Sequence, residues 1–402
     1  MATLPAALTV SLGDVPVGTL LLDRNGAIEF RWFPSYLHSF PRPVLGQQFL
    51  DNPDVVLRSR TTRLPPWFSN LLPEGALRAL VAEQAGFQPV HEYALLNVLG
   101  QDLPGAVQVQ AADDVAVPMG VEDNALELFD KEDAWRFSLA GVQLKFSAQR
   151  TERGLTIPAS GLGGDWIVKL PDARYSQVPA NEFATMSWAR ASGIDTPEFM
   201  LVALADISGL PGSATVRGET HALAVRRFDR PSAGLRVHIE DFAQVLGVYP
   251  EQKYKVANYE TLASIVLALA GQDGFLDFLR RLVFVVASGN GDAHLKNWSL
   301  IYRDGVTAQL SPSYDQVSTI QYINNDKLAL NLGGSKNWTD LTMAKFQRMA
   351  RKLSVDESVV RDAVEESVQE IRQAWKADGK VQFTSEQQKF IEAHWQQVPL
   401  MG

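Results

Sequence analysis

The sequence predicts an α+β protein made of a small N-terminal α/β domain, a strand-rich lobe and a helical C-terminal lobe. Three observations support this prediction. Short strands alternate near the N-terminus, a second strand-rich region follows an acidic irregular stretch, and helical patterns dominate from about Ile239 onward. We place the N-terminal domain at residues 1–112, a linker at 113–133, the strand-rich lobe at 134–236 and the helical lobe at 237–402.

The N-terminal domain is predicted from alternating apolar residues and turn signals. Residues 8–12 and 17–22 place apolar side chains in the alternating manner that is typical of strands buried on one face. The segment 23–26 (DRNG) then provides a strong hairpin turn before a further strand. A helix is expected at Tyr93–Leu99, ending at Gly100.

The two lobes that follow are predicted from a change in pattern. Residues 135–229 are mostly strand-like, with one helix around Glu182–Ser192. Later helices begin at two predicted capping boxes, Ser354–Glu357 and Thr384–Gln387. A strand-rich lobe followed by a helical lobe is the arrangement of protein kinases, which bind nucleotide between the lobes. The prediction is therefore a two-lobed, protein-kinase-like fold with an all-helical C-terminal lobe.

The composition excludes several classes of protein. The chain contains no cysteine, which excludes disulfides, thiolate metal sites and a Cys nucleophile, and suits a reducing cytoplasm. A net charge of −9 and the lack of a long basic stripe argue against autonomous binding of DNA or RNA. The N-terminus lacks the positive region of a signal peptide, and polar residues interrupt the apolar stretch Leu262–Ala287. No membrane span is therefore expected.

The segment Ser288–Trp298 carries the most specific chemical pattern. Phosphoryl transfer needs a carboxylate beside the attacking hydroxyl and oxygen ligands that hold magnesium against the phosphates. Asp292 and Asn297 have the spacing at which the catalytic loop of protein kinases supplies these two groups. Lys296 could neutralise charge on the transferred phosphoryl group, and His294 could brace the loop. The alternative is a turn with a buried polar pair and no catalytic role.

A second carboxylate follows where kinases place another magnesium ligand. Strand-like residues 298–302 lead into a turn at 303–305, and this hairpin returns the chain to Asp315. Asp315 offers a hard oxygen ligand to a hard cation, and the alternative is a loop aspartate that caps the next element. Tyr314 could pack on adenine or be an ordinary core tyrosine.

Lys169 lies inside an apolar strand, where a lysine is costly unless it is paired. In kinases such a lysine holds the nucleotide phosphates and pairs with a helix glutamate, for which Glu182 is the candidate. The alternative is an edge-strand lysine that points into water. Residues 223–230 form an apolar strand ending in charge, as in a kinase hinge or, equally, an exposed strand end. No P-loop, zinc-protease or nucleophile-elbow motif supports an NTPase or a hydrolase.

Taken together, these motifs resemble those of the HipA family of toxin–antitoxin kinases over nearly the full length of the chain. The matching stretches are residues 68–75 (FSNLLPEG), 99–105 (LGQDLPG), 138–145 (SLAGVQLK), 167–171 (IVKLP), 181–182 (NE), 224–230 (AVRRFDR), 240–241 (ED), 292–297 (DAHLKN) and 310–315 (LSPSYD). Each stretch is short, and the specificity of the resemblance comes from their number and order.

The resemblance implies a kinase-like fold with the N-terminal domain packed on the small lobe, and it implies ATP and Mg²⁺ as cofactors. It implies Asp292 as the catalytic aspartate, Asn297 and Asp315 as magnesium ligands, and Ser138 as an autophosphorylated serine that inactivates the protein. The other implied nucleotide-binding residues are Lys169 on the phosphates, Ala140, Gly141, Val142, Gln143 and Lys145 in the phosphate loop, and Arg226, Arg227 and Phe228 in the hinge.

A biological role is implied as well. Members of the family inhibit translation by phosphorylating an aminoacyl-tRNA synthetase, glutamyl-tRNA synthetase in the best-known case, and a small helix-turn-helix antitoxin holds them in check. The resemblance thus implies a HipB-like partner, contact with DNA only through that partner, and a cytoplasmic location. Leu144 stands in the phosphate loop where a polar or charged residue is expected, so the target of this chain does not follow from the motifs.

Two other functions stay open at this point. One is a kinase for a small molecule or a lipid, although the sequence has no basic face or amphipathic anchor for a membrane. The other is a non-catalytic kinase-fold module that binds partners or acts as a co-repressor. The complete set of Asp292, Asn297, Asp315 and Lys169 argues against this third function.

Overall fold

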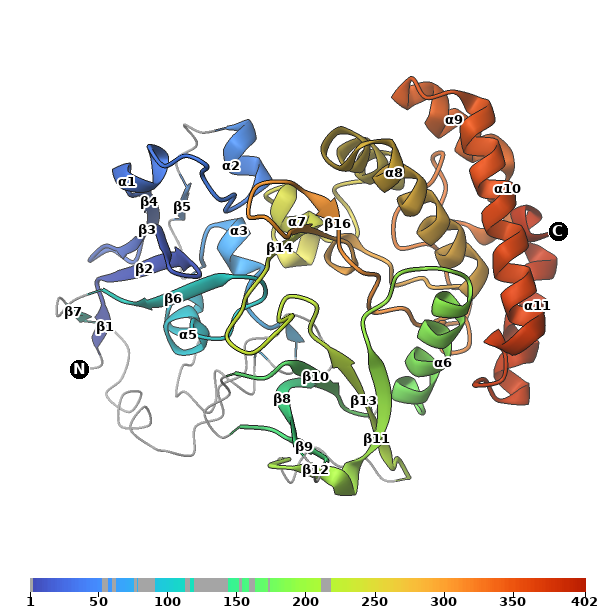
Figure 1. Ribbon diagram of the computed structural model, residues 1–402, viewed down its shortest axis with the longest axis horizontal. Coiled ribbons are helices and arrows are strands. Elements are labelled where there is room, and N and C mark those ends of the chain that lie inside the picture. The colour runs from blue at the N-terminus through green and yellow to red at the C-terminus, as the bar shows by residue number, and fades with distance from the viewer. Residues whose placement is uncertain are drawn as a thin grey trace. The chain divides into compact units, whose positions relative to one another are not determined.

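The computed structural model describes residues 3–52, 57–59, 63–75, 78, 91–112, 116–118, 144–151, 154–158, 163–172, 174–210 and 218–402 (Figure 1). By its internal contacts the chain divides into two units, each made of segments that are distant in sequence. The first unit contains residues 1–172, 202–250 and 301–306, and the second contains residues 173–201, 251–300 and 307–402. The predicted N-terminal domain and most of the strand-rich lobe therefore share one unit, and most of the helical lobe forms the other.

A five-stranded antiparallel sheet forms the N-terminal part of the first unit. Its strands are β2 (Ala7–Leu12), β3 (Val15–Leu22), β4 (Ile28–Trp32), β5 (Leu57–Ser59) and β6 (Val107–Ala111), in the order β5-β4-β3-β2-β6. Alternate residues of β2 are buried, which confirms the predicted one-sided strand. The Asp23 carboxylate accepts hydrogen bonds from the backbone N–H groups of Asn25 and Ala27, and these bonds fix the predicted hairpin turn.

Short helices and one strand pair complete this part of the unit. They are β1 (Thr3–Pro5), α1 (Pro34–Leu37), α2 (Gln47–Asp51), α3 (Pro66–Ser69), α5 (Glu92–Leu99) and β7 (Ala116–Pro118). The predicted helix before Gly100 is confirmed by α5, whose Tyr93 and Leu96 are fully buried. Strand β7 pairs antiparallel with β1, so the predicted linker contains a short strand where we expected irregular chain.

The second sheet of the first unit comes from the predicted strand-rich lobe. Its strands include β8 (Lys145–Thr151), β9 (Gly154–Thr156), β10 (Trp166–Lys169), β12 (Ile207–Ser208) and β13 (His221–Arg226), in the order β13-β10-β8-β9-β12. Strand β10 has β13 on one side and β8 on the other, and Lys169 at its end is only 5% exposed. The alternative of an edge-strand lysine pointing into water is therefore wrong.

The remaining elements of the first unit link this sheet to the helical part of the chain. They are η1 (Leu204–Asp206), β14 (His238–Asp241), α7 (Phe242–Val245) and the beginning of η3 (Pro250–Gln252), while β11 (Phe199–Ala203) runs into this unit from the second. Buried Glu240 on β14 accepts hydrogen bonds from the Gln47 backbone N–H, the Trp67 indole and the Tyr302 hydroxyl. One carboxylate thus connects three segments that are far apart in sequence.

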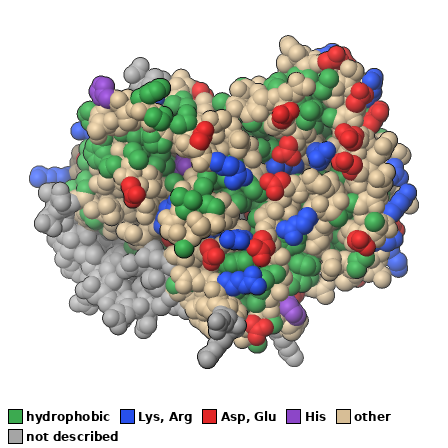
Figure 2. Space-filling model, viewed as in Figure 1, with side chains coloured by type: hydrophobic (Ala, Val, Ile, Leu, Met, Phe, Trp, Pro, Cys, Tyr) green, Lys and Arg blue, Asp and Glu red, His purple; other side chains and the backbone are tan. Residues whose placement is uncertain are grey.

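The second unit is mainly helical. Its principal helices are α6 (Val178–Ala191), α8 (Tyr259–Ser288), α9 (Met343–Leu353), α10 (Glu357–Ala374) and α11 (Ser385–Gln397), with shorter turns η4 (Leu295–Asn297), η5 (Trp338–Asp340), η6 (Trp375–Gly379) and η7 (Pro399–Met401). Trp188 of α6 is fully buried, lies 4.9 Å from the Phe284 ring and donates its indole N–H to the Ile371 carbonyl. Lys, Arg, Asp and Glu side chains are interspersed over α10 and α11 in Figure 2, as on a solvent-facing helix surface.

One of the two predicted capping boxes is correct. Thr384 and Gln387 bond reciprocally at the start of α11, as predicted. The box at Ser354 is wrong, because Ser354 ends α9 in the left-handed region with φ of 55°, and Asp356 caps α10 instead. Because α9 and α10 follow each other closely, Ser354 caps the C-terminus of α9 and does not cap the N-terminus of α10.

Helix α8 contains the apolar stretch noted in the sequence. It is the one helix in the described part of the chain that is long and apolar enough to cross a membrane, judged by length and composition. Gly271 breaks its helical geometry with φ of 69° and ψ of −168°. Residues 281–288 beyond this break are all buried, so the second half of α8 is a core helix of the second unit.

Three short strands interrupt the lobe, residues 237–402, that the sequence predicted as all-helical. One is β14, and the other two are β15 (Ser299–Tyr302) and β16 (Gln309–Leu310), which are neighbours in one sheet and form the predicted hairpin around residues 303–305. Gly305 has φ of 80°, which suits the tight turn of this hairpin. The hairpin carries the chain from the end of η4 back to the segment that contains Asp315.

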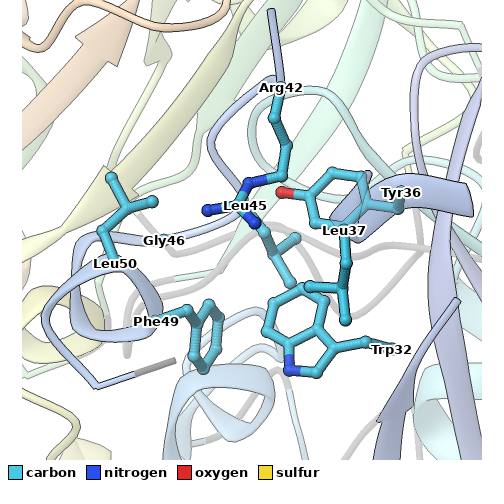
Figure 3. A pocket seen from close by; sticks show the side chains of 8 residues that line it. All are labelled: Trp32, Tyr36, Leu37, Arg42, Leu45, Gly46, Phe49 and Leu50. Carbon is cyan, nitrogen blue, oxygen red and sulfur yellow. The ribbon is translucent and has the colours of Figure 1, made fainter. Parts of the chain in front are cut away.

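A small aromatic pocket lies in the N-terminal part of the first unit. It is lined by Trp32, Tyr36, Leu37, Arg42, Leu45, Gly46, Phe49 and Leu50 (Figure 3). The Trp32 and Tyr36 rings stack at 5.5 Å, and the Phe49 ring meets Trp32 edge-on. The pocket contains none of the residues that the sequence predicts for catalysis or nucleotide binding.

Candidate active site

The predicted catalytic loop is held in one shape by hydrogen bonds within the second unit. Helix α8 ends at Ser288, and Gly289 after it, with φ of 61°, turns the chain into the loop. The buried Asn290 side chain accepts from the Asp292 backbone N–H and donates to the Gln316 side chain. The Gly291 backbone N–H donates to the Thr319 hydroxyl at 2.6 Å. The loop is therefore fastened to the segment that carries Asp315.

The Asn297 amide is oriented by the loop that it belongs to. Its Nδ2 donates to the Asp292 carbonyl at 2.9 Å, and its backbone N–H donates to the His294 carbonyl at 2.9 Å. The amide nitrogen is thereby engaged inside the loop, which leaves Oδ1 as the ligand atom for a cation. The structure thus places the two predicted residues of the catalytic loop next to each other.

The Asp292 carboxyl reaches solvent, with 45% of its side chain accessible. Its Oδ1 accepts a hydrogen bond from the Tyr254 hydroxyl and lies 3.9 Å from His294 Nε2. Desolvation by the surrounding chain raises the pKa of Asp292, and the charges of Asp315 and Asp326 raise it further, although Tyr254 and the Lys253 ammonium oppose them. The site thus concentrates negative charge around Asp292.

Asp315 adopts a backbone conformation that few residues tolerate. Its φ of 52° lies in the left-handed region, where aspartate and asparagine are favoured over most other side chains. Its neighbour Tyr314 bonds through its hydroxyl to the Ser299 hydroxyl at 2.5 Å and to the Lys296 carbonyl at 2.9 Å. Tyr314 thus braces the catalytic loop from the Asp315 segment, and its contact with adenine stays a prediction.

Sequence reasoning missed four residues that shape this loop. They are Tyr254, Asn290, Thr319 and Asp326. The Asp326 carboxylate accepts from the Thr319 hydroxyl at 2.5 Å, and burial raises the pKa of Asp326. Tyr254 and Asp326 lie outside every recognisable motif, and only Asn290 was within reach of sequence reasoning, as the residue two before Asp292.

The predicted phosphate-binding lysines lie opposite each other in the first unit. Lys169 of β10 is the cross-strand partner of Lys145 of β8 in an antiparallel ladder. Directly opposite residues project on the same face of a sheet, and like charges in that position destabilise it. Glu182 is buried on α6 in the second unit, and its predicted pairing with Lys169 stays a prediction.

Arg227, one of the predicted hinge residues, has its side chain in a buried ionic cluster. Arg227 is 2% exposed, and its guanidinium binds Asp102 at 2.8 Å and Asp229 at 2.9 Å. Its backbone N–H donates to the Asp165 carbonyl. Arg226 ends β13 with an exposed side chain, and Phe228 follows β13. A nucleotide contact through the Arg227 side chain would require this buried ion pair to break.

Several predicted residues lie outside the part of the chain that the structure describes. They are Ser138, Ala140, Gly141, Val142 and Gln143. Their roles in autophosphorylation and phosphate binding stay predictions. Lys145, at the end of the same motif, begins β8.

Comparison with known proteins decides the family. Family models describe a HipA N-terminal domain that matches residues 8–110 and a HipA-like C-terminal domain that matches residues 137–375. The chain belongs to the HipA family. The resemblance inferred from the sequence motifs is thereby confirmed.

The chain is also similar to two curated relatives and to one solved structure. The protein Y4dM of Sinorhizobium fredii, named provisionally as a kinase, is 45% identical over 93% of this chain and 92% of its own length. The serine/threonine-protein kinase toxin HipA of Shewanella oneidensis is 26% identical over 78% of this chain and 76% of its own length. A solved complex of HipA, HipB and operator DNA from Shewanella oneidensis covers 98% of this chain and 96% of the compared chain, with a TM-score of 0.73 and 22% identity. This likeness confirms the predicted two-lobed, kinase-like α+β fold.

Proposed function

We propose that this HipA-family chain is an ATP-dependent serine/threonine protein kinase that inhibits growth when it is released from an antitoxin. One observation carries the proposal: a single loop carries Asp292 and Asn297, the Asn297 amide donates to the Asp292 main-chain carbonyl, and Asn290 of the same loop bonds to Gln316 beside Asp315. Asp292, Asn297 and Asp315 carry the groups that phosphoryl transfer to a hydroxyl requires. Membership of a family with a named kinase toxin supports the same conclusion.

Each residue of the loop has a distinct proposed role. Asp292 binds the attacking hydroxyl and accepts its proton, because 45% of its side chain is accessible. Lys296 stabilises charge on the transferred group, and His294 braces the loop through its 2.7 Å backbone bond to the Asp292 carbonyl. With these groups in place, a bound protein hydroxyl would be oriented for attack on the terminal phosphate.

The proposed metal ligands fit magnesium by their chemistry. Asn297 Oδ1 and an Asp315 carboxylate oxygen are hard donors, and the mutual repulsion of Asp292 and Asp315 favours a cation near them. In the described part of the chain no cluster of three His, Asp or Glu side chains forms a complete metal site. Magnesium would therefore need oxygen ligands from the nucleotide and from water. When bound, it would neutralise charge on the phosphates.

The nucleotide is proposed to contact the strand-rich part of the chain. Lys169 and Lys145 would bind its phosphates from one face of the sheet, and the segment 140–145 would close over them. The adenine would bind backbone groups of the segment 226–228. Glu182 would orient Lys169, as a helix glutamate does in other kinases.

The substrate and the partners are proposed from the family. We propose that the target is an aminoacyl-tRNA synthetase in the cytoplasm, whose phosphorylation would stop translation. We also propose a HipB-like helix-turn-helix antitoxin as partner, with DNA contacted through it. The solved Shewanella complex of HipA, HipB and operator DNA, which shares the fold of this chain, supports this assembly.

Labelled ATP would test the kinase proposal directly. Purified protein, magnesium and γ-labelled ATP would be incubated with extract of the host cell, and labelled molecules would be separated by size. We expect radioactive phosphate on one protein of the extract. A translation assay would then measure whether phosphorylation of that protein inhibits protein synthesis. Label on a lipid or a small molecule alone would contradict the protein substrate. Nucleotide binding without any transfer would favour the non-catalytic module.

We propose further that Ser138 switches the kinase off. A phosphate there would add about two negative charges to the segment expected over the nucleotide phosphates, and repulsion would weaken ATP binding. Mass spectrometry after incubation with ATP would detect the modification, and Ser138→Asp should bind ATP more weakly than Ser138→Ala. This part of the proposal would be wrong if Ser138 stayed unmodified under conditions in which the protein phosphorylates a target.

A further inference from the structure

One tyrosine that the catalytic motif does not include lies directly on the proposed catalytic aspartate. The Tyr254 hydroxyl donates a hydrogen bond to Oδ1 of Asp292 within the second unit. Its ring meets the His294 imidazole edge-on, with centroids 4.9 Å apart and planes at 79°. The Lys253 ammonium lies 5.7 Å from the centre of the same ring. The phenol is thus surrounded by groups of the candidate site.

The backbone around Tyr254 is fastened to the catalytic loop. The carbonyl of Lys253 accepts from the Leu295 backbone N–H at 3.3 Å, and the carbonyl of Tyr254 accepts from the Lys336 ammonium at 3.1 Å. These bonds bring the side chain within reach of Asp292. The residue is nevertheless 36% exposed, so part of its side chain already lies at the surface.

The hydrogen bond from Tyr254 to Asp292 is of the kind that a substrate hydroxyl makes before phosphoryl transfer. In phosphoryl transfer the catalytic aspartate accepts a hydrogen bond from the hydroxyl that will attack the phosphate. The Tyr254 hydroxyl makes that interaction with Asp292 in this structure. We propose that Tyr254 occupies the acceptor position of the resting protein, and that its phenol must leave Asp292 before a substrate hydroxyl or a water molecule can bind there. The inference rests on the kinase function proposed above and adds an internal competitor to it.

A positioning role for Tyr254 is the main alternative, and the structure favours competition. The main chain at Asp292 is held by the loop itself, because its backbone N–H is bound by Asn290 and its carbonyl accepts from His294 and Asn297. The loop therefore keeps its shape without the phenol. The phenol instead takes an oxygen of the carboxylate that an acceptor would use.

The two roles predict opposite effects when the hydroxyl is removed. With water as acceptor, ATP hydrolysis needs no identified substrate. Tyr254→Phe should raise the hydrolysis rate several-fold and leave the KM for ATP unchanged, because water gains access to Asp292. A positioning residue would instead lower kcat, so an unchanged or reduced rate would overturn the proposal.

A matched control separates this effect from the loss of any phenol hydroxyl. Tyr249 lies in the first unit and donates its hydroxyl to the Leu64 carbonyl. Tyr249→Phe should hydrolyse ATP at the wild-type rate. The double variant Tyr254→Phe with Asp292→Asn should lose the increase, because the added turnover depends on the aspartate.

A spectroscopic measurement tests the contact without any turnover. Protein labelled with ¹³C at the ζ carbon of tyrosine gives one resonance that is absent from Tyr254→Phe. This resonance should shift in Asp292→Ala, because the phenol loses its carboxylate acceptor. An unchanged resonance would show that the Tyr254 hydroxyl does not bind the Asp292 carboxylate. If the resonance shifts but no variant transfers phosphate to water or protein, it is the kinase function that fails.

Discussion

Charged groups around Asp292 act on its protonation in opposite directions. Burial raises the pKa of Asp292, as do the charges of Asp315 and Asp326, whereas Tyr254 and Lys253 lower it. A proton acceptor in catalysis must be ionised, so the excess of negative charge works against its role in the free protein. A cation bound near Asp315 would reverse this balance. A bound metal ion would therefore favour the proposed role of Asp292 as a proton acceptor.

Replacing the carboxylate of Asp292 should abolish transfer and keep the fold. Asp292→Asn is nearly isosteric, and its amide oxygen can still accept from Tyr254. Removing a general base typically lowers the rate by about 100-fold or more. A kinase assay with labelled ATP would measure the loss, and Asp273→Asn on the exposed part of α8 is the matched control. Transfer at the wild-type rate would contradict the mechanism.

Asp315 should be tested with asparagine, because its backbone restricts the choice of substitute. With φ of 52°, alanine would add backbone strain of about 1 kcal/mol, whereas asparagine tolerates this conformation. Asp315→Asn should raise the magnesium concentration needed for tight ATP binding, since a charged oxygen ligand is lost. Calorimetric titration of ATP at several magnesium concentrations would measure this. Equal dependence on magnesium in both proteins would count against the ligand.

Strand β13 and the loop after α5 are joined by a buried ionic cluster in the first unit. Asp102 Oδ1 accepts from Arg227 at 2.8 Å and from Arg230 at 3.3 Å, and Asp229 binds both arginines. Burial alone would raise the pKa of Asp229, but the two guanidinium groups lower it to about 2. The cluster therefore ties the N-terminal domain to the end of the strand that leads to the proposed hinge.

Removing one acid from this cluster should destabilise the protein strongly. Asp102→Ala would leave two buried guanidinium groups with one acidic partner, and breaking a buried pair costs about 3–5 kcal/mol. Urea denaturation should show a lower midpoint. The exposed pair of Arg361 and Asp362 provides the control, because Asp362→Ala should cost less than about 1 kcal/mol. Equal losses in the two variants would refute the structural role of the cluster.

Local sequence patterns predicted elements well where local forces decide them. Alternation in β2, the turn at Asp23 and the capping box at Thr384 are confirmed because each depends on neighbouring residues. The box at Ser354 failed because a second helix end competes for the same serine. Strand β7 was missed because its partner β1 is far away in sequence.

The candidate site shows the same limit. The spacing of Asp292 and Asn297 follows from one loop and was predictable. The contact of Tyr254 with Asp292 joins residues 38 apart in sequence, and no local pattern marks it. The cluster around Arg227 likewise required Asp102, which is 125 residues away. Tertiary contacts of this kind appear in the sequence only as isolated polar residues.

At the scale of the molecule, stability should depend on pH through two buried groups of the first unit. Burial raises the pKa of Glu240 to about 7 and lowers the pKa of His238 to about 4. The folded state therefore retains the Glu240 proton between about pH 4.5 and 7, so this group makes stability fall as pH rises. Between about pH 4 and 6.5, His238 is protonated in the unfolded chain and neutral in the folded state, so its contribution to the unfolding free energy rises with pH. The two contributions oppose each other.

Glu240→Gln isolates one side of this balance. Glutamine cannot titrate, so the unfolding free energy of wild type minus that of the variant should decrease as pH rises from 5 to 7. The slope should be at most about 1.4 kcal/mol per pH unit. Other groups, including His238, contribute equally to both proteins and cancel. Urea denaturation at four pH values would measure the difference, and a constant difference would contradict the buried, proton-retaining state of Glu240.

The discontinuous makeup of the first unit has a consequence for biosynthesis. Glu240 and its partner Tyr302 are 62 residues apart, so at a translation rate of roughly 5–20 residues per second the tyrosine leaves the ribosome about 3 to 12 seconds after the glutamate. During this interval the nascent chain carries an acidic group whose final hydroxyl partner has not yet been made. The last piece of the first unit, residues 301–306, also follows the catalytic loop in the chain. A nascent chain that stops before residue 301 would therefore carry the whole candidate catalytic loop before either unit is complete.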